Sequence, residues 1–416
     1  MSMNSPYAFA DLRILATSDV HMHITGWDAL RDRNVAGRGM DVLAHTIETA
    51  RNTANGACLL FDNGDFLQGT PVGAICAAYA SDVRHPWPDI VNALSYDAIG
   101  LGNHDFDFGV PFLERTVAHM DAPTVCASLA SGSVAGVVPT LLIQRKVTCS
   151  DGQVRPLVIG VTSVLPPQTA IWNHRYLTGL IELEGGVSAA RRAVTALQAQ
   201  GADIIVMLCH SGAGASGTKD DENFGAEIAA KVEGIDAIIL GHTHERLPKT
   251  AGPKDLNGVP AVMPGYAAEV LGQIDLRLGW TDVGWHVAGH DATLRLPGAE
   301  DQPVPAITAL AAPALAKTQE TLDQTLAQTT SGFHTYFGML MSGPSDALIA
   351  RAMINVIAEQ VAGSDLADLP LIASVAPMTM GGAQGRATLS MCLRDRFKCA
   401  IWRCWHLIPT PFGRRC

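Results

Sequence analysis

The sequence is short of positive charge and contains no long apolar run. Its 416 residues include 29 Lys and Arg against 40 Asp and Glu, a formal net charge of −11 at pH 7. Binding to a nucleic-acid polymer needs clustered Lys and Arg, so this balance argues against such a partner. It leaves a single nucleotide open as a ligand, because metal ions can supply positive charge locally. No apolar stretch reaches the roughly 18–20 residues of a membrane span, so no membrane partner is expected.

The composition is that of a globular chain with a large core, because 48% of the residues are hydrophobic and only 17% are charged. A chain of this length exceeds what one domain usually holds, so two domains are expected. The start, Met1–Ala10, lacks the basic flank and the continuous apolar centre of a secretory signal. The chain as written is therefore predicted to stay in the cytoplasm. The sequence gives no indication of the oligomeric state.

From Leu12 to about Leu296, apolar runs alternate with amphipathic stretches. This alternation predicts an α/β fold with a largely parallel sheet flanked by helices. Helices are expected at Met40–Asn52, Val110–Met120, Gly186–Gln200 and Glu222–Val232. Strands are expected at Leu12–Ala16, Cys58–Phe61, Ala98–Leu101, Leu157–Thr162, Asp203–Leu208 and Asp236–Leu240.

The pattern changes towards the end of this region. Antiparallel strands are expected at Val259–Met263, Leu271–Leu278 and Trp285–Ala288. The proline-rich segment Leu296–Pro313 marks a boundary, and a helix is expected to follow it to about Gln328. A second region opens near Ser331, with a helix predicted at Ser345–Ala362 and a strand at Leu371–Val375.

Metal-seeking side chains follow five of the apolar runs. They lie in Asp19-Val20-His21, Gly64-Asp65, Gly102-Asn103-His104-Asp105, Cys209-His210-Ser211 and Gly241-His242-Thr243-His244. In an open α/β sheet, ligands gather outside the carboxyl ends of the strands, so we expect these side chains to cluster along one edge. Carboxylate, carboxamide and imidazole groups together suit two divalent cations and predict a metal-dependent hydrolase.

Phosphoester hydrolysis is the reaction that such a cluster suits best. Two metal ions about 3.5–4 Å apart neutralise the substrate's charge and activate water. Asp65, on a glycine turn, suits a bridging position between them. His104 directly follows Asn103, so the two cannot easily face the same ion, and His104 is free to protonate the leaving oxygen. Asp107 is placed to orient His104, whereas Asp105 is expected to be a turn residue that caps the next helix.

The ordered motifs resemble the calcineurin-like metallophosphoesterase superfamily. More narrowly, they resemble the bacterial 5′-nucleotidase family on its 2′,3′-cyclic-nucleotide 2′-phosphodiesterase/3′-nucleotidase branch. Supporting stretches are Leu12–His21, Phe61–Asp65 and Asn257–Gly265. The resemblance implies a four-layer α/β/β/α catalytic domain at 11–296, a linker with a helix at 297–330 and the start of a C-terminal nucleotidase domain at 331–385.

The resemblance also implies the site residues. One metal ion would be held by Asp19, His21, Asp65 and His244. The other would be held by Asp65, Asn103, His210 and His242. His104 and Asp107 would form the catalytic pair. His244 favours the cyclic-nucleotide branch, because typical 5′-nucleotidases carry Gln there; a 5′-nucleotidase or UDP-sugar hydrolase is the alternative.

The resemblance further implies a nucleotide as the small-molecule substrate, bound mostly by aromatic rings of the second domain. Mn, Zn, Co and Fe all suit these ligands, so the metals are not distinguished. Many relatives are periplasmic. His23 is expected to lie outside the ligand set, and His45, His119 and His334 to have no role. Gly212–Gly217 matches the G-x-G-x-x-G pattern but is interpreted as a metal-site loop, because no helix is expected at its third Gly.

The final segment, 386–416, differs from the rest. It holds four of the nine Cys, whose spacings fit no paired zinc pattern. The other five lie mostly in apolar runs and are expected to be buried thiols. Reading the back-translated codons of Met391–Trp402 one base earlier allows a sequence that resembles what the family has after the segment matching Ala376–Gly382. A frameshift is therefore our hypothesis, which makes the chain a truncated nucleotidase or an inactive remnant with poor solubility.

Overall fold

The computed structural model describes residues 8–215, 221–298, 300–327, 343–375 and 397–398. The chain divides into two units, the first ending at Gln319 and the second beginning at Glu320. This division falls inside the predicted linker. Most of the segment 386–416, together with His334 and the end of the Gly212–Gly217 motif, lies outside the described residues.

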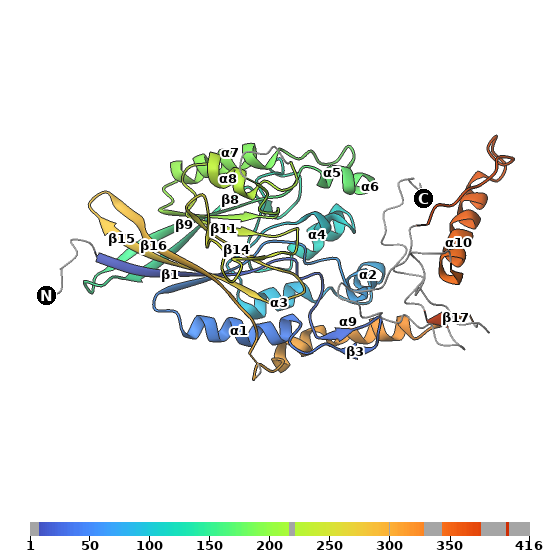
Figure 1. The fold of residues 1–416 in the computed structure, drawn as a ribbon, viewed down its shortest axis with the longest axis horizontal. Helices are drawn as coiled ribbons and strands as arrows, with labels where there is room; N and C mark the ends of the chain where they lie inside the picture. The colour runs from blue at the N-terminus through green and yellow to red at the C-terminus, as the bar shows by residue number, and fades with distance from the viewer. Residues whose placement is uncertain (1–7, 216–220, 299, 328–342, 376–396, 399–416) are drawn as a thin grey trace. The chain divides into compact units, whose positions relative to one another are not determined.

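Two large sheets form the centre of the first unit (Figure 1). In the first sheet, the strand order is β16 (Gly284–Arg295), β15 (Leu271–Thr281), β1 (Ala8–Thr17), β4 (Ala57–Asp62), β5 (Ala98–Ile99), β6 (Thr124–Val125) and β7 (Val137–Val138). In this sheet β1, β4, β5, β6 and β7 run parallel to one another, and β15 and β16 are antiparallel to their neighbours.

The second sheet has the order β12 (Arg246–Leu247), β14 (Val259–Pro264), β11 (Ala237–Leu240), β10 (Ile204–Cys209), β9 (Val154–Val164) and β8 (Thr140–Thr148), with β13 (Asp255–Leu256) also beside β14. Its four central strands run parallel. A small hairpin, β2 (Trp27–Asp28) and β3 (Arg33–Asn34), lies apart from both sheets.

Helices cover the outer faces of both sheets. On the first sheet they include α1 (Met40–Asn52), α3 (Trp87–Leu94), α4 (Val110–Val117) and the first part of α9 (Pro305–Leu322). On the second they are α7 (Gly186–Ala199) and α8 (Gly225–Lys231). Shorter elements are α2 (Pro71–Ala78), a 3-10 turn η1 (Asn103–Phe106), α5 (Thr169–Trp172) and α6 (His174–Leu177). The predicted four-layer fold is confirmed.

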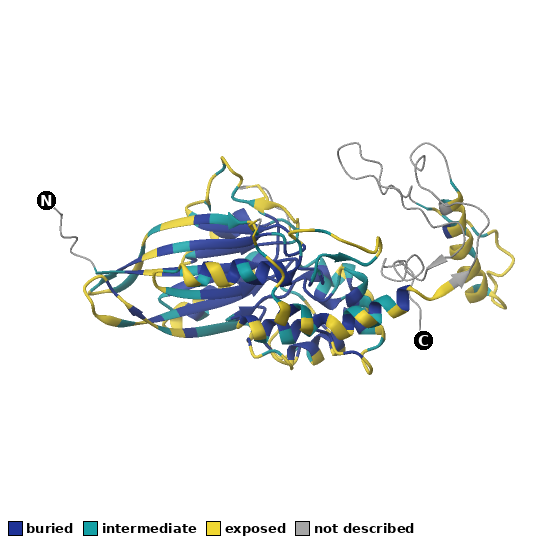
Figure 2. Cartoon of the chain, turned by 90° about the horizontal axis from the view of Figure 1, so that it is seen from below, coloured by how far each residue is buried: buried dark blue, intermediate teal, exposed yellow. Residues whose placement is uncertain are grey.

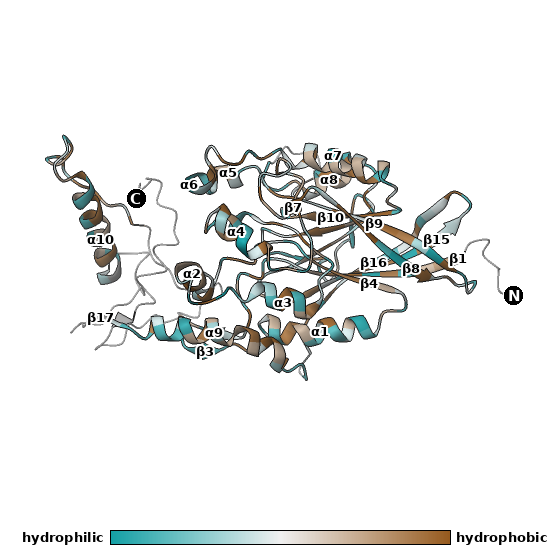
Figure 3. Ribbon diagram, turned by 180° about the vertical axis from the view of Figure 1, so that it is seen from behind, coloured by the Kyte–Doolittle hydropathy of each residue, from teal (hydrophilic) through white to brown (hydrophobic). Residues whose placement is uncertain are grey.

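The central parallel strands are largely buried on both faces. Ile14 of β1, Phe61 of β4 and Val206 of β10 lie in the core between the sheets, whereas Leu15 packs into the core under the helices. Successive side chains of a strand point to opposite faces, so a strand covered on both sides needs apolar residues at nearly every position. Figures 2 and 3 show these strands as buried and largely hydrophobic.

Most predicted elements are confirmed, with a few corrections. Val259–Met263 was expected to form an antiparallel meander with the two strands that follow, but β14 lies in the other sheet, parallel to β11 and antiparallel to β12 and β13. Leu371–Val375 was expected to be a strand, but it has no regular structure. The helix expected from Glu222 begins only at Gly225. The helix expected after the proline-rich segment starts within it, at Pro305, where proline's fixed φ suits a first helical turn, and ends at Leu322 rather than near Gln328, with β17 following it.

The second unit contains α10 (Pro344–Val361) and a short pairing of β17 (Thr325–Ala327) with β18 (Phe397–Lys398). The predicted helix Ser345–Ala362 is confirmed by α10. Among the described residues, no helix is both long enough and apolar enough to cross a membrane. The described cysteines of the first unit are free, and all are buried except the partly buried Cys58.

Candidate metal centre

The predicted ligands meet where the parallel strands of both sheets end. Asp19 and His21 follow β1, Asp65 follows β4, Asn103 follows β5, His210 follows β10, and His242 and His244 follow β11. Five of these residues have positive φ, namely Asp19 (52°), His21 (47°), Asp65 (59°), His242 (70°) and His244 (58°). Non-glycine residues in this region cost about 1–3 kcal/mol each and cluster at functional sites. The chain therefore holds these side chains together against local strain.

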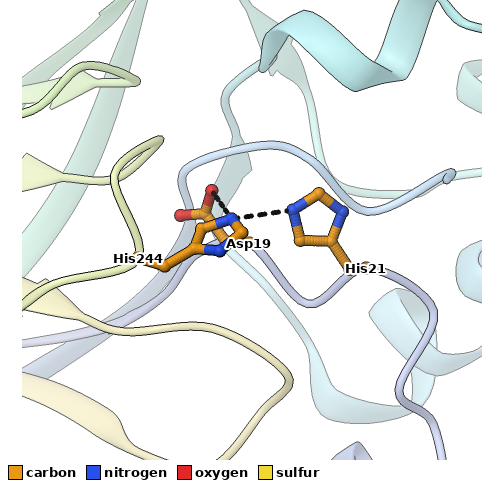
Figure 4. A group of neighbouring side chains, drawn as sticks. All are labelled: Asp19, His21 and His244. Carbon is orange, nitrogen blue, oxygen red and sulfur yellow. Dashed lines mark hydrogen bonds and ion pairs between the residues drawn. The ribbon is translucent and has the colours of Figure 1, made fainter. Parts of the chain in front are cut away.

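The first group consists of Asp19, His21 and His244 (Figure 4). The Nε2 atoms of the two histidines lie 3.1 Å apart, and His244 Nε2 lies 3.5 Å from Asp19 Oδ1. The other nitrogen of His21, Nδ1, lies 2.9 Å from the carbonyl of Gln68 and donates to it. Burial lowers the pKa of His21, which keeps its ring neutral. Its Nε2 lone pair is thus available to a cation.

The second group consists of Asp19, Asp65 and His210, and it is completely buried. His210 Nδ1 donates to the carbonyl of Asn63 at 2.7 Å. Its Nε2 lies 3.1 Å from Asp65 Oδ2 and 3.8 Å from Asp19 Oδ1, yet it is not aligned for a hydrogen bond. A buried nitrogen without a hydrogen-bond partner beside two carboxylates fits a metal ligand.

Electrostatics couple the buried group tightly. Burial opposes charge on His210, but Asp65 and Asp19 outweigh it and raise the pKa of His210 to about 10. Burial likewise works against ionised Asp65 and Asp19, and the charge of His210 nevertheless holds the pKa of each carboxyl below its usual range. In the metal-free chain, a proton on His210 therefore supplies the positive charge that a cation would bring.

Asn103 and His242 form a further pair at this edge. Asn103 Oδ1 lies 2.9 Å from His242 Nδ1. The backbone N–H of His242 donates to both carboxylate oxygens of Asp19, at 3.0 and 3.2 Å. The ring of His242 lies 5.7 Å from that of His210, centroid to centroid. All seven predicted ligands thus come together. Asp19 belongs to both groups of candidate ligands, whereas Asp65 belongs to one of them, so the role of Asp65 as the ligand shared by two ions stays a prediction.

His104 lies beside the ligands, with its side chain 41% exposed. Its Nδ1 is 2.8 Å from Asp107 Oδ2, and its backbone N–H donates to Asp65 Oδ1 at 2.7 Å. The ring centroid lies 5.4 Å from that of His21. Burial works to lower the pKa of His104, but the hydrogen bond to Asp107 and the charge of Asp65 raise it to about 9. The imidazole is therefore protonated at neutral pH in the metal-free chain.

Asp105 has a role that the sequence analysis missed. It was expected to cap the helix near Val110, but α4 has no side-chain cap. Instead its buried carboxylate accepts backbone N–H groups of Gly102, Asp65, Phe66 and Leu67. Asp105 thereby ties the loop of Asp65 to the loop of Asn103. Its position directly after the Gly-Asn-His motif was the available signal.

Two aromatic rings and one carboxylate around the histidines were also missed. Trp172 stacks on His242, with ring centroids 5.5 Å apart, and Tyr266 stacks on His244 at 4.9 Å. Glu222 Oε1 lies 3.0 Å from His242 Nε2. His23 lies against the edge of Tyr266 rather than in either ligand group, as expected. No sequence pattern linked these residues to the motifs, because each lies in a separate segment: Trp172 in α5, Glu222 before α8 and Tyr266 after β14.

Comparison with known proteins identifies the family. Residues 12–246 match the family model described as calcineurin-like phosphoesterase. The chain belongs to the calcineurin-like phosphoesterase family. This confirms the predicted phosphoesterase class, and the family implies divalent metal ions, for which the described residues offer the two ligand groups above.

Several relatives of this calcineurin-like phosphoesterase cover nearly all of it. It is 30% identical to the trifunctional nucleotide phosphoesterase protein YfkN of Bacillus subtilis over 90% of its own length and 27% of that protein. It is 29% identical to the 2′,3′-cyclic-nucleotide 2′-phosphodiesterase/3′-nucleotidase of Haemophilus influenzae over 91% of its length and 60% of that protein. The chain thus spans less than two thirds of these relatives.

Solved structures agree on the fold. A crystal structure of the calcineurin-like phosphoesterase YfkN from Bacillus subtilis superposes with a TM-score of 0.70 at 30% identity, covering 75% of this chain and 98% of that one. A 5′-nucleotidase from Staphylococcus aureus, described as putative in its structure, gives a TM-score of 0.66 at 21% identity, covering 83% of this chain and 66% of that one. The second match concerns the fold alone.

Proposed function

We propose that this phosphoesterase hydrolyses nucleotides, as a 2′,3′-cyclic-nucleotide 2′-phosphodiesterase and 3′-nucleotidase that uses two divalent metal ions. The observation that carries the proposal is the convergence of seven oxygen and nitrogen ligands next to the His104–Asp107 pair. The relatives from Haemophilus influenzae and Yersinia enterocolitica that bear this activity in their names match about nine tenths of the chain and support the substrate class.

The ligands divide between two ions in this proposal. Asp19, His21, Asp65 and His244 hold one ion, and Asp65, Asn103, His210 and His242 hold the other. When bound, the ions supply positive charge for the phosphoryl oxygens and an activated water. The residues of the chain fix the geometry: backbone carbonyls orient His21 and His210, and Asp105 fixes the loop that presents Asp65.

His104 acts as the general acid in this proposal. Asp107 accepts the Nδ1–H of His104, so the proton to be donated is on Nε2. With its pKa raised to about 9, the ring carries that proton at neutral pH. The leaving oxygen of a ribose phosphoester becomes an alkoxide unless it is protonated, and His104 supplies the proton from the partly exposed side of the centre.

We also assign residues 11–296 to the catalytic domain, 297–330 to a linker with a helix and 331–385 to the beginning of a second, nucleoside-binding domain. The proposed partner is a small nucleotide. The first of these segments contains every proposed metal ligand and the His104–Asp107 pair, so hydrolysis of a simple diester needs only this domain.

The test is hydrolysis by the purified 416-residue chain with and without added Mn²⁺. The substrates are bis(p-nitrophenyl) phosphate, 2′,3′-cyclic AMP, 3′-AMP and 5′-AMP. We expect metal-dependent turnover of the generic diester that is lost in His104→Ala, and preference for the cyclic and 3′ substrates. Preference for 5′-AMP would instead support the alternative, a 5′-nucleotidase. Soluble, metal-loaded protein that hydrolyses none of the four would contradict the proposal.

A further inference from the structure

The imidazole of His242 is held between two oxygen atoms. Its Nδ1 lies 2.9 Å from Asn103 Oδ1, and its Nε2 lies 3.0 Å from Glu222 Oε1. Both oxygens can only accept hydrogen bonds, so the single hydrogen of a neutral ring can serve only one of them; with a cation beside Asn103 it would sit on Nε2, facing Glu222. Nδ1 then presents its lone pair beside the oxygen of Asn103. Two such acceptor atoms side by side form part of a cation site.

The backbone around Glu222 is anchored to the metal edge. Ser211, the residue after His210, donates through Oγ to the carbonyl of Glu222 at 2.7 Å. The same Oγ accepts the backbone N–H of Phe224 at 2.9 Å. The backbone N–H of Gly225 also donates to the carbonyl of Gly212 at 3.1 Å. The start of α8 is thus fixed relative to His210, and Glu222 is fixed with it.

Close packing leaves little freedom between these segments. A Cβ atom on Gly212 would come within 2.2 Å of Asn223 Oδ1 and 2.6 Å of Thr243 Cγ2, so any larger residue there would displace the side chains of Asn223 and Thr243. Trp172 stacks on His242 at an interplanar angle of 17°. Glu222 therefore fixes the rotation of the imidazole in its plane, while Trp172 covers one of its faces.

We propose that Glu222 is a positioning residue for the second metal ion: its carboxylate holds His242 in the orientation that directs Nδ1 to the ion alongside Asn103. This inference rests on the proposed two-metal function. His21 and His210 donate the corresponding hydrogen bond to backbone carbonyls, those of Gln68 and Asn63. His242 donates it to a side chain, that of Glu222, so its orientation can be altered by a substitution that leaves every ligand in place.

The test counts Mn²⁺ bound to metal-stripped protein by equilibrium dialysis. For Glu222→Ala we expect the ion held by His210 and His242 to bind about 10–100-fold more weakly than in the wild type, the usual effect of removing such a partner, and the other ion to bind as before. Glu222→Gln keeps an accepting oxygen and should recover most of this affinity. Glu233→Ala, an exposed glutamate of the loop after α8, is the matched control and should bind both ions normally.

Melting temperatures of the metal-free variants separate positioning from folding. We expect Glu222→Ala to melt with the wild type, because the side chain of Glu222 is 44% exposed. Normal binding of both ions by Glu222→Ala would overturn the inference, as would loss of both equivalents together with a lower melting temperature. A wild-type chain that binds fewer than two ions would refute the proposed function instead.

Discussion

The two ligand groups share Asp19 but differ in their access to solvent. Around His210 the side chains are 0–1% exposed, whereas His244 in the other group is 39% exposed. Charges in a buried site interact strongly and are screened little by water and salt. We therefore expect an ion at His210 to bind tightly and to exchange slowly, and an ion at His244 to exchange readily. The same types of ligand thus form one site that holds its ion tightly and one site whose ion exchanges readily.

The largest difference should appear when one histidine is removed from each group. His210→Ala leaves Asp19 and Asp65 buried without their partner, and breaking a buried pair costs about 3–5 kcal/mol. His244→Ala removes a partly exposed side chain and should cost no more than about 1 kcal/mol. The measurement is urea unfolding of the metal-free variants. Equal losses in the two variants would show that burial does not distinguish the groups.

His104 connects the two groups, because its backbone binds Asp65 while its ring faces His21. His104→Ala should lower turnover of the generic diester about 10²–10⁴-fold, the usual contribution of a general acid.

The raised pKa of His104 predicts that wild-type turnover falls as pH rises through about 9, where the proton is lost. Bound cations repel that proton, so the fall begins at or below this value.

Asp107→Asn is the matched variant for His104. The amide cannot supply the charge that raises the pKa of His104, so the alkaline fall in turnover should move to lower pH while both metal ions still bind. A pH–rate profile measured with Mn²⁺ checks this. An unshifted profile would mean that another group supplies the proton.

The positions of the ligands could be predicted, because the strands and the residues that follow them can both be recognised in short stretches of sequence. Buried parallel strands are continuous apolar runs, and the residues after Leu101 or Leu240 must then lie at the sheet edge. The sheet to which β14 belongs could not be predicted, because the partners of a strand depend on the path of the connections and not on its residue pattern. The start of α8 could not be predicted either, because Glu222 fits the helical pattern of the residues after it. The side chain of Ser211 binds the carbonyl of Glu222 and the N–H of Phe224, and the helix begins only after these two residues.

The release of protons on metal binding should also distinguish the two ligand groups, with a smaller effect than the substitutions above. His210 is protonated in the metal-free chain, because its pKa is raised to about 10, whereas burial lowers the pKa of His21 and leaves it neutral. A metal ion must displace the proton of His210, so affinity at the buried position should rise about tenfold per pH unit between pH 6 and 8. Affinity at the exposed position should change little. Calorimetric Mn²⁺ titrations in buffers of different ionisation enthalpy count the protons released by each ion.

The smallest effect is expected for His244→Gln. The carboxamide oxygen of Gln can replace an imidazole nitrogen as a ligand, and typical 5′-nucleotidases, which this site resembles, carry Gln there. Because position 244 is open to solvent, the new side chain can adjust without disturbing the buried carboxylates, and Mn²⁺ affinity should fall less than about tenfold, or 1.4 kcal/mol. The paired variant His210→Gln has no such room and should lose the buried ion. Equilibrium dialysis of both variants decides the matter: if His244→Gln loses as much affinity as His210→Gln, the identity of the ligand matters more than its burial.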